Sequence, residues 1–381
     1  MLSRLLSAGA MGETIEGWVV VSVSDFEFPT TRDLYIYPWH PVTGFGAQTA
    51  VDLPDVTTSD IPWTTLAPDG ETLYTNSSDS TTGNFNAYPF NAVTGTLGSV
   101  YRPSIPRVGF PDFAVVTPDS NNFFVGSDAS PYVRAFPFDP STGIGTKYAD
   151  PSSYSLNYPA SADVSPDGSV VVFGGRLSYP WNENIQAWEF SSVGGFGDKY
   201  DLSNLGSTYP VGQINQLKFS PDGTKLAVGY RTDPYVRVYT WDNSSGWLAY
   251  YEPTSYSLGG DAPRDRVLAL AWSKDSNYLV CGIDNDNSSP GDPSLMAYPI
   301  SSNGVFGAQV TPIVAVTGYR VRSLAFTTDG NALFVARDDR SSSKIIDAYR
   351  WIKSSGFGTK YTPAAGVTEL PVSVNFTYRK A

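Results

Sequence analysis

Few residues in this chain belong to the types that most often carry out catalysis. Its 381 residues include one histidine, His40, and one cysteine, Cys281. A Ser-His-acid triad or a His-rich zinc site would have to use His40, which lies where a predicted strand meets a turn, and we expect a capping or exposed role for it. Cys281 lies in an apolar run, so we expect a small buried strand residue. With no phosphate-binding glycine loop, HExxH or CxxC motif present, the sequence predicts no catalytic residues.

One acidic segment has the pattern of a metal site. Asp284, Asp286 and Ser288 have the one-three-five spacing of calcium-binding loops, and their oxygen atoms suit that ion. The sixth position is Ser289 instead of Gly, and the twelfth is Leu295 instead of Glu. An ordinary Asx-rich turn is therefore favoured. We expect no cofactor, and calcium at these three residues stays as the weaker alternative.

A second group of candidates consists of charged and aromatic residues on predicted loops of variable length. Binding residues are often found on loops that a rigid scaffold carries. A solvated loop surface is the simpler interpretation, and a ligand site is the alternative. The binding candidates are Glu27, Trp181, Glu183, Arg231, Asp233, Arg337 and Asp338.

The elements that would position these loops come from an internal repeat. Its clearest copy has strand-length runs at 214–220, 225–229 and 235–241, separated by turn residues and followed by a short fourth run. Four strands in about fifty residues are the size of one propeller blade. An aspartate recurs in the first turn of each copy, where we expect a structural role. These aspartates are Asp69, Asp119, Asp167, Asp222, Asp275 and Asp329.

The number of copies predicts how the ring closes. The aromatic residue of the third strand occurs seven times, at Tyr37, Tyr88, Phe136, Trp188, Tyr239, Tyr298 and Tyr349. The turn aspartate occurs only six times, and the missing first strand matches residues 372–377 at the C-terminus. We therefore predict an all-β fold, a seven-bladed β-propeller with four antiparallel strands per blade. One composite blade would combine residues 18–48 with 371–381, which leaves no open sheet edge.

Composition agrees with this fold class and excludes two kinds of partner. The chain has 35 Gly, 29 Pro and 14% aromatic residues but only 16% charged residues, a mixture typical of strands and tight turns. The net charge is −12, and no run of Lys or Arg is present, so we expect no nucleic acid partner. No apolar stretch reaches the roughly 18 residues that span a bilayer, so we expect no membrane insertion.

The first 17 residues precede the repeats. They have one early Arg and a short, broken apolar part, which makes a poor secretory signal. We expect an N-terminal arm at 1–17 outside a propeller at 18–381. The arm would anchor the protein to a partner through Leu2, Leu5, Leu6 and Met11.

The repeats resemble a known superfamily. Ser-Pro-Asp-Gly at 220–223, Leu-Ala-Val-Gly at 226–229 and Tyr-Val-Arg-Val-Tyr at 235–239 are similar to WD-repeat and seven-bladed lactonase-like propellers. The chain departs from WD repeats because one histidine cannot supply their Gly-His pairs, and Trp-Asp occurs only at 241–242. The Gly-Phe-Gly-Thr-Lys-Tyr segment at 356–361 is similar to propeller proteins encoded among tailed-bacteriophage structural genes. That likeness implies a virion component.

From these features we expect a non-enzymatic structural protein of a phage virion, associated with the tail or decorating the capsid. It would be made in the host cytoplasm, anchor to other virion proteins and present its loop face to a partner or to a host-surface glycan or receptor. Two alternatives stay open. The first is a lactonase-like, metal-dependent hydrolase that uses Asp284, Asp286, Asp233 and Glu183. The second is a glycan-binding propeller that uses the loop aromatics Trp181, Tyr179, Tyr154 and Tyr158.

Overall fold

The computed structural model describes most of the chain. The described residues are 15–24, 34–53, 63–76, 85–101, 111–128, 130–156, 158–175, 184–201, 212–254, 266–284, 293–312, 316–339, 344–368 and 370–380. All regular structure within these ranges is β-strand. They accordingly contain no helix long and apolar enough to cross a membrane.

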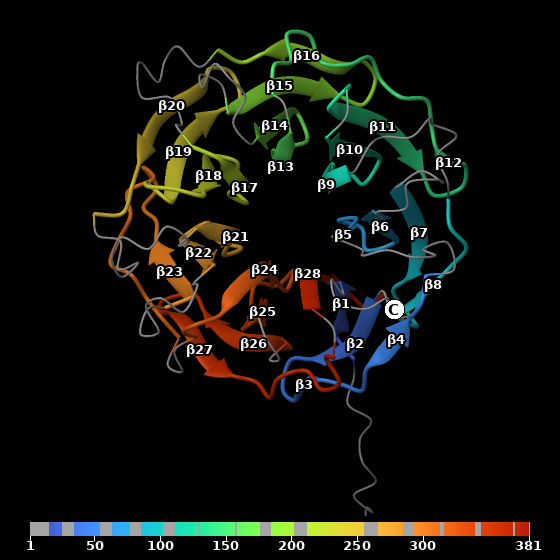
Figure 1. Cartoon of the computed structure of the whole chain (residues 1–381), viewed down its shortest axis with the longest axis vertical. Helices are drawn as coiled ribbons and strands as arrows, with labels where there is room; N and C mark the ends of the chain where they lie inside the picture. The colour runs from blue at the N-terminus through green and yellow to red at the C-terminus, as the bar shows by residue number, and fades with distance from the viewer. Residues whose placement is uncertain are drawn as a thin grey trace, which may run out of the picture.

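The strands form seven sheets arranged as blades around a central axis (Figure 1). The composite blade contains β28 (Leu370–Tyr378), β1 (Gly17–Ser24), β2 (Leu34–His40), β3 (Gly44–Phe45) and β4 (Thr49–Val51). Blade 2 contains β5 (Thr64–Leu66), β6 (Thr72–Asn76), β7 (Phe85–Asn91) and β8 (Thr96–Leu97). Blade 3 contains β9 (Pro111–Val116), β10 (Asn122–Ser127), β11 (Val133–Asp139) and β12 (Gly143–Ile144).

The remaining blades follow in chain order. Blade 4 contains β13 (Pro159–Val164), β14 (Val170–Gly175), β15 (Ile185–Ser191) and β16 (Gly195–Lys199). Blade 5 contains β17 (Ile214–Phe219), β18 (Lys225–Tyr230), β19 (Val236–Asp242) and β20 (Gly246–Tyr251). Blade 6 contains β21 (Val267–Trp272), β22 (Tyr278–Ile283) and β23 (Leu295–Pro299). Blade 7 contains β24 (Arg320–Phe326), β25 (Ala332–Asp338), β26 (Lys344–Ile352) and β27 (Gly356–Lys360).

The predicted closure of the ring is confirmed. β28 pairs antiparallel with β1, with Val374 opposite Val21 and Asn375 opposite Val20. Beyond the strands, the Arg379 N–H donates to the Glu16 carbonyl at 2.8 Å. The C-terminal strand is therefore the innermost strand of the N-terminal blade.

Two blades depart from four plain strands. In blade 6 the fourth strand is reduced to isolated bridges, Ile300 with Phe306 and Ala297 with Val310. In the composite blade, β4 adds a second outer pairing along β2. Both differences lie at the outer edge of the ring, away from the axis.

The apolar core is divided among the seams between neighbouring blades. Seven buried clusters are present, each made by side chains of two adjacent blades. Val20 and Leu73, for example, share the cluster between the composite blade and blade 2. Second strands such as β18 and β22 are buried on both faces because each sheet is packed between two neighbours. This packing makes the ring a firm scaffold.

In each blade, two positions that are distant in the sequence lie close together at one edge of the sheet. The first strand of a blade starts, and the second strand ends, at the same edge because the two are antiparallel. Since first strands line the axis (Figure 1), these positions lie at one end of it. We call the residues found there in blades 5 to 7 the axial rim: Gln213, Arg231, Arg266, Asp284, Arg320, Arg322 and Asp338.

Candidate functional site

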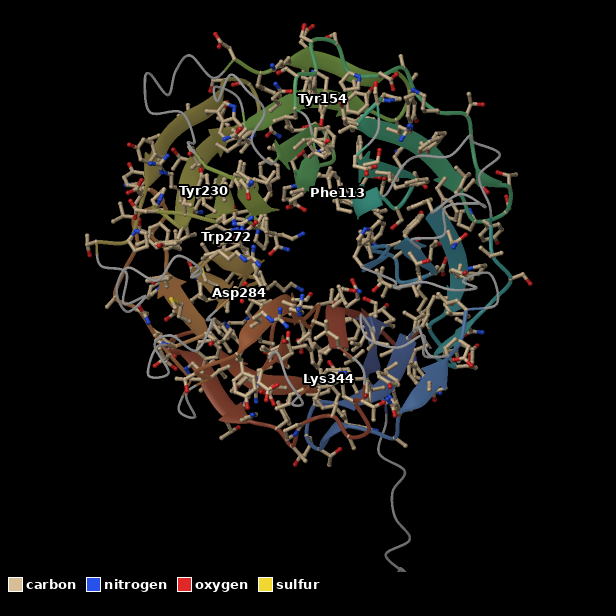
Figure 2. The ribbon with its side chains drawn as sticks, viewed as in Figure 1. Phe113, Tyr154, Tyr230, Trp272, Asp284 and Lys344 are labelled. Atoms are coloured by element: carbon tan, nitrogen blue, oxygen red, sulfur yellow. The ribbon has the colours of Figure 1, made fainter. Side chains whose placement is uncertain are left out.

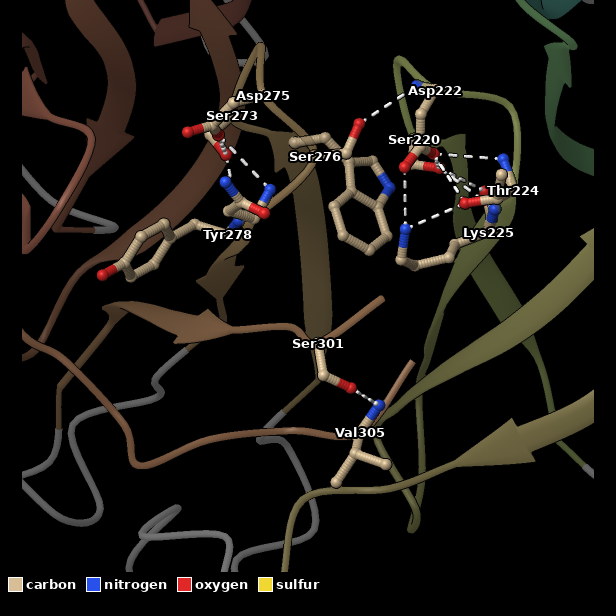
Figure 3. A network of polar contacts seen from close by, with 12 residues as sticks. Ser220, Asp222, Thr224, Lys225, Ser273, Asp275, Ser276, Tyr278, Ser301 and Val305 are labelled. Atoms are coloured by element: carbon tan, nitrogen blue, oxygen red, sulfur yellow. Dashed lines mark hydrogen bonds and ion pairs between the residues drawn. The ribbon is translucent and has the colours of Figure 1, made fainter. Parts of the chain in front are cut away.

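The six repeated aspartates lie in the turns between first and second strands, at the opposite edge from the axial rim. In blade 5, Asp222 accepts hydrogen bonds from the Ser220 hydroxyl, the Thr224 N–H and the Lys225 ammonium group (Figure 3). Burial acts to raise the pKa of Asp222, but these bonds outweigh it and lower the pKa to about 2. The Ser276 hydroxyl of blade 6 accepts from the Asp222 N–H at 3.0 Å. The structural role predicted for these turns is confirmed.

The predicted loop candidates fall into three groups. Arg231 and Asp233 are exposed beside the end of β18. Arg337 and Asp338 are instead buried at the end of β25, so a solvated surface is the wrong description for them. The remaining predicted residues lie outside the described part of the chain: Glu27, Trp181, Glu183, Asp286, Ser288, Leu2, Leu5, Leu6 and Met11.

At the axial rim of blade 6, an arginine and an aspartate form a pair. The Arg266 Nε–H donates to Asp284 Oδ2 at 2.8 Å. Asp284 is 3% exposed and the Arg266 side chain is 32% exposed, so the guanidinium group shields the carboxylate. Figure 2 shows Asp284 at the inner part of the ring.

Blade 7 repeats this pair and adds a second arginine. Arg320 donates to Asp338 Oδ1 through Nε at 2.9 Å and also through Nη2. Arg322 donates to Asp338 Oδ2 through Nε at 2.6 Å. Burial lowers the pKa of the Arg322 guanidinium, and Asp338 acts against that shift. One buried carboxylate thus holds two guanidinium groups, each about a fifth exposed.

The two pairs form one cluster. A backbone bridge joins Asp284 of blade 6 to Arg320 of blade 7. The charges of Asp284 and Arg320 also affect the pKa of Arg322. Three arginines and two aspartates therefore meet at one end of the axis, and the excess charge is positive in a protein whose net charge is −12.

A second ionic group lies behind the pair in blade 7. Arg337 donates to buried Asp347 at 2.7 Å, and the Lys360 ammonium nitrogen lies 2.8 Å from the same carboxylate. Burial acts to lower the pKa of Arg337, but Asp347 outweighs it and raises the pKa. The Arg337 guanidinium also lies 3.9 Å from the centre of the Tyr319 ring. These contacts fix the residues that precede Arg320 and Asp338 in the chain.

Of the three proposed calcium ligands, the structure describes only Asp284, and Asp284 does not support the calcium hypothesis. Asp284, its first proposed ligand, binds the cation of Arg266 instead. Among the described residues, no group of three or more His, Cys, Asp or Glu side chains is placed to hold a metal ion. The exposed groups at the axial rim are guanidinium groups. Their positive charge and N–H donors suit an anionic ligand.

Other residues with reactive or aromatic side chains lie away from the axial rim. His40 ends β2 and is half-buried, and Cys281 is buried in β22, where burial raises its pKa. Tyr154 packs against Trp188 at 5.6 Å between ring centres, so its aromatic ring belongs to a blade seam. Tyr158 is 52% exposed and is the one described aromatic of the glycan hypothesis that faces solvent.

Three functional candidates were missed by the sequence reasoning: Arg266, Arg320 and Arg322. A signal for two of them is present in the sequence. Arg266 and Asp284 are 18 positions apart, and so are Arg320 and Asp338. Gln213 and Arg231 have the same spacing, and Arg231 Nη1 donates to Gln213 Oε1 at 3.0 Å. Eighteen positions is the length of the hairpin that the first and second strands of a blade form. Residues with this spacing therefore lie opposite each other at the open end of that hairpin.

Comparisons with known proteins agree on the fold. A family model described as WD domain, G-beta repeat matches residues 254–288, a segment shorter than one repeat of this chain. Comparison with curated protein sequences finds no match.

Solved structures are similar over nearly the whole chain. A candidate 6-phosphogluconolactonase from Bacteroides uniformis has a TM-score of 0.69 at 16% identity and covers 96% of this chain and 100% of its own. A candidate 6-phosphogluconolactonase from Bacteroides fragilis has a TM-score of 0.69 at 14% identity, covering 96% and 99%. A periplasmic gluconolactonase from Pseudomonas aeruginosa has a TM-score of 0.67 at 15% identity, covering 96% and 100%.

These comparisons correct the functional expectation from sequence. The predicted seven-bladed propeller and the likeness to lactonase-like propellers are supported. The interpretation as a non-enzymatic virion component is wrong, because these three full-length structural matches carry lactonase names and none is a phage protein. The Gly-Phe-Gly-Thr-Lys-Tyr resemblance reflects a repeated strand, and a repeat carries fold more firmly than function.

Proposed function

We propose that this protein is a hydrolase that opens a sugar lactone at the axial rim. The observation that carries the proposal is the cluster of Arg266, Arg320 and Arg322 with Asp284 and Asp338. It combines hydrogen-bond donors of fixed positive charge with carboxylates at one place on the ring. The full-length likeness to structures named as lactonases supports this reaction class.

A lactone is a cyclic ester, and its hydrolysis has two electrostatic requirements. Water adds to the carbonyl carbon, negative charge collects on the carbonyl oxygen, and the bond to the ring oxygen then breaks. Guanidinium N–H groups can stabilise the developing oxyanion. A carboxylate can accept the proton of the attacking water and return it to the ring oxygen, which leaves as a hydroxyl group. The product is a hydroxy acid, which releases one proton at neutral pH.

The two aspartates are differently suited to act as the base. Both oxygens of Asp338 accept N–H groups from arginines. Asp284 accepts from Arg266 through Oδ2. Since Asp338 balances two guanidinium groups and Asp284 balances one, we assign Asp284 as the base and Arg266 as its partner that faces the oxyanion, while Asp338 holds Arg320 and Arg322 in position. No step in this scheme uses a metal ion, because the axial rim presents cations where a metal would need ligands.

The test is hydrolysis of a panel of sugar 1,5-lactones, both neutral and carrying a phosphate or carboxylate group. Proton release in a pH-stat, corrected for spontaneous hydrolysis, measures the rate. We expect Asp284→Asn to lower kcat by about 10²- to 10⁴-fold. Asp275→Asn is the matched control, since Asp275 is an aspartate of the same blade in the turn at the opposite edge.

Two results would reject the proposal. One is a wild-type rate no higher than spontaneous hydrolysis on every lactone. The other is an equal loss of activity in both variants. Thermal denaturation of each variant checks that the blade is folded at the assay temperature.

A further inference from the structure

The charge of the axial rim differs among the three blades that build it. In blade 5, Arg231 contacts the neutral side chain of Gln213, and no ion pair of Arg231 with a described carboxylate is present. In blade 6, one arginine faces one aspartate. In blade 7, two arginines share Asp338. The rim therefore has an excess positive charge at each end and a neutral pair in the middle.

We infer that the axial rim has two anion subsites, Arg231 in blade 5 and Arg320 with Arg322 in blade 7, on either side of the Arg266–Asp284 pair. The ligand that fits is elongated and carries an anionic group at each end. This inference deepens the proposed function and rests on it for the reaction, because the middle of such a ligand would lie at the residues assigned to hydrolysis. The substrate class is then a lactone with two anionic groups, such as carboxylates or phosphates.

The order of blades 5, 6 and 7 around the axis fixes the spatial order of the two anion subsites and the Arg266–Asp284 pair between them. Inner strands β17, β21 and β24 are neighbours around the axis (Figure 1). The 18-residue spacing places Arg231, Asp284 and Asp338 at equivalent ends of second strands. A ligand following the rim from blade 5 to blade 7 therefore passes the middle pair.

Guanidinium groups are suited to this recognition. They stay charged and present several N–H donors in a plane, which matches carboxylate and phosphate oxygens. Arg322 uses Nε for Asp338, and Arg266 uses Nε for Asp284, so in both side chains the bond to aspartate orients the remaining donors. In a chain of net charge −12, a local positive group also concentrates anionic ligands.

The experiment measures binding of straight-chain α,ω-dicarboxylates of increasing length by calorimetry at constant ionic strength. Each is compared with the monocarboxylate of the same length. We expect one range of lengths to bind about tenfold more tightly than the monocarboxylate, the factor that one charge-assisted hydrogen bond supplies. Arg231→Gln and Arg322→Gln should each remove most of this preference. Arg350→Gln is the matched control, since Arg350 is an exposed arginine of β26 away from the axial rim.

The inference is overturned if no dicarboxylate binds more tightly than its monocarboxylate, or if Arg231→Gln keeps the full preference. Its failure is distinct from failure of the proposed function. A dicarboxylate preference that needs both arginines, in a protein that hydrolyses no lactone, would retain the two subsites and reject the hydrolase. Lactone hydrolysis without any dicarboxylate preference would do the reverse.

Discussion

Aspartates recur at both edges of the blades, and the two sets are bonded differently. The turn aspartate Asp222 is 42% exposed and accepts hydrogen bonds from residues within three positions of itself. The side chain of the rim aspartate Asp338 is 2% exposed and accepts from Arg320 and Arg322, which are 18 and 16 positions away. The first set closes a local turn, whereas the second neutralises cations that the fold brings together.

This difference teaches where function can be expected in a repeated fold. Turn aspartates accept hydrogen bonds within their own hairpin, as Asp222 and Asp275 do, and Asp167 accepts one more from Asn243 of the next blade. The hairpin bonds need only nearby residues, so the same turn can occur in blade after blade. Rim aspartates hold arginines whose outer N–H groups remain on the surface of the site. The repeat thus builds a scaffold at one edge and allows variation in charge at the other.

The largest effect is expected from Asp338→Asn. The neutral amide cannot compensate the two guanidinium groups, which are mostly buried. Removing one partner of a buried ion pair costs about 3–5 kcal/mol. We expect a loss of that size in the free energy of unfolding in urea, together with loss of lactone hydrolysis. A loss below about 1 kcal/mol would show that solvent already compensates the charges of Arg320 and Arg322. The rim aspartate would then contribute no more to stability than a turn aspartate does.

Asp222→Asn is expected to have a smaller effect that is confined to stability. The wild-type carboxylate has a pKa of about 2, below the ordinary value of 3.8. Its contribution is therefore present above pH 3.8 and is lost as the pH falls through about 2. We expect a loss of about 1 kcal/mol at pH 7, which disappears near pH 2.

The control for Asp222→Asn is activity, because this turn is at the edge opposite the axial rim. Hydrolysis by the variant should equal that of the wild type at a temperature where both are folded. A fall in kcat without unfolding would mean that the two edges are coupled, and the comparison would fail.

The fold could be predicted from local chemistry. The aspartate turns, the third-strand aromatics and the matching C-terminal strand are each recognised within one segment of the chain. Counting them predicts seven blades and the pairing of β28 with β1, because closure needs a first strand for the N-terminal blade. Local bonding and simple counting were sufficient here.

The candidate site could be predicted only in part. Asp284 and Asp338 were identified as charged loop residues, but their partners were not. Arg266 directly precedes β21 and Arg320 begins β24, and neither has its aspartate partner within the same segment of the sequence. Only the register between β24 and β25, which places Arg320 opposite Asp338, reveals the pair. The spacing of 18 carries this information, but it has meaning only once the hairpin length is known.

The smallest effect is expected at a carboxyl group of neither set, Glu16. Its N–H donates to the Trp39 carbonyl at 2.9 Å beside the closure of the ring. Burial and the charge of Asp329 raise the pKa of Glu16, against a hydrogen bond from Tyr378 that lowers it. A carboxyl group whose pKa is raised in the folded protein favours folding below pH 4.5, and this contribution is lost as the pH rises through the folded pKa. Glu16→Gln is neutral at every pH, so it should stabilise the protein at pH 7 by about 0.5 kcal/mol and have little effect at pH 4. Thermal denaturation of the variant and the wild type at the two pH values measures the difference. A variant that is less stable than the wild type at pH 7 would contradict the prediction and would show that the charge of Glu16 stabilises the fold, as the charges of the aspartates do.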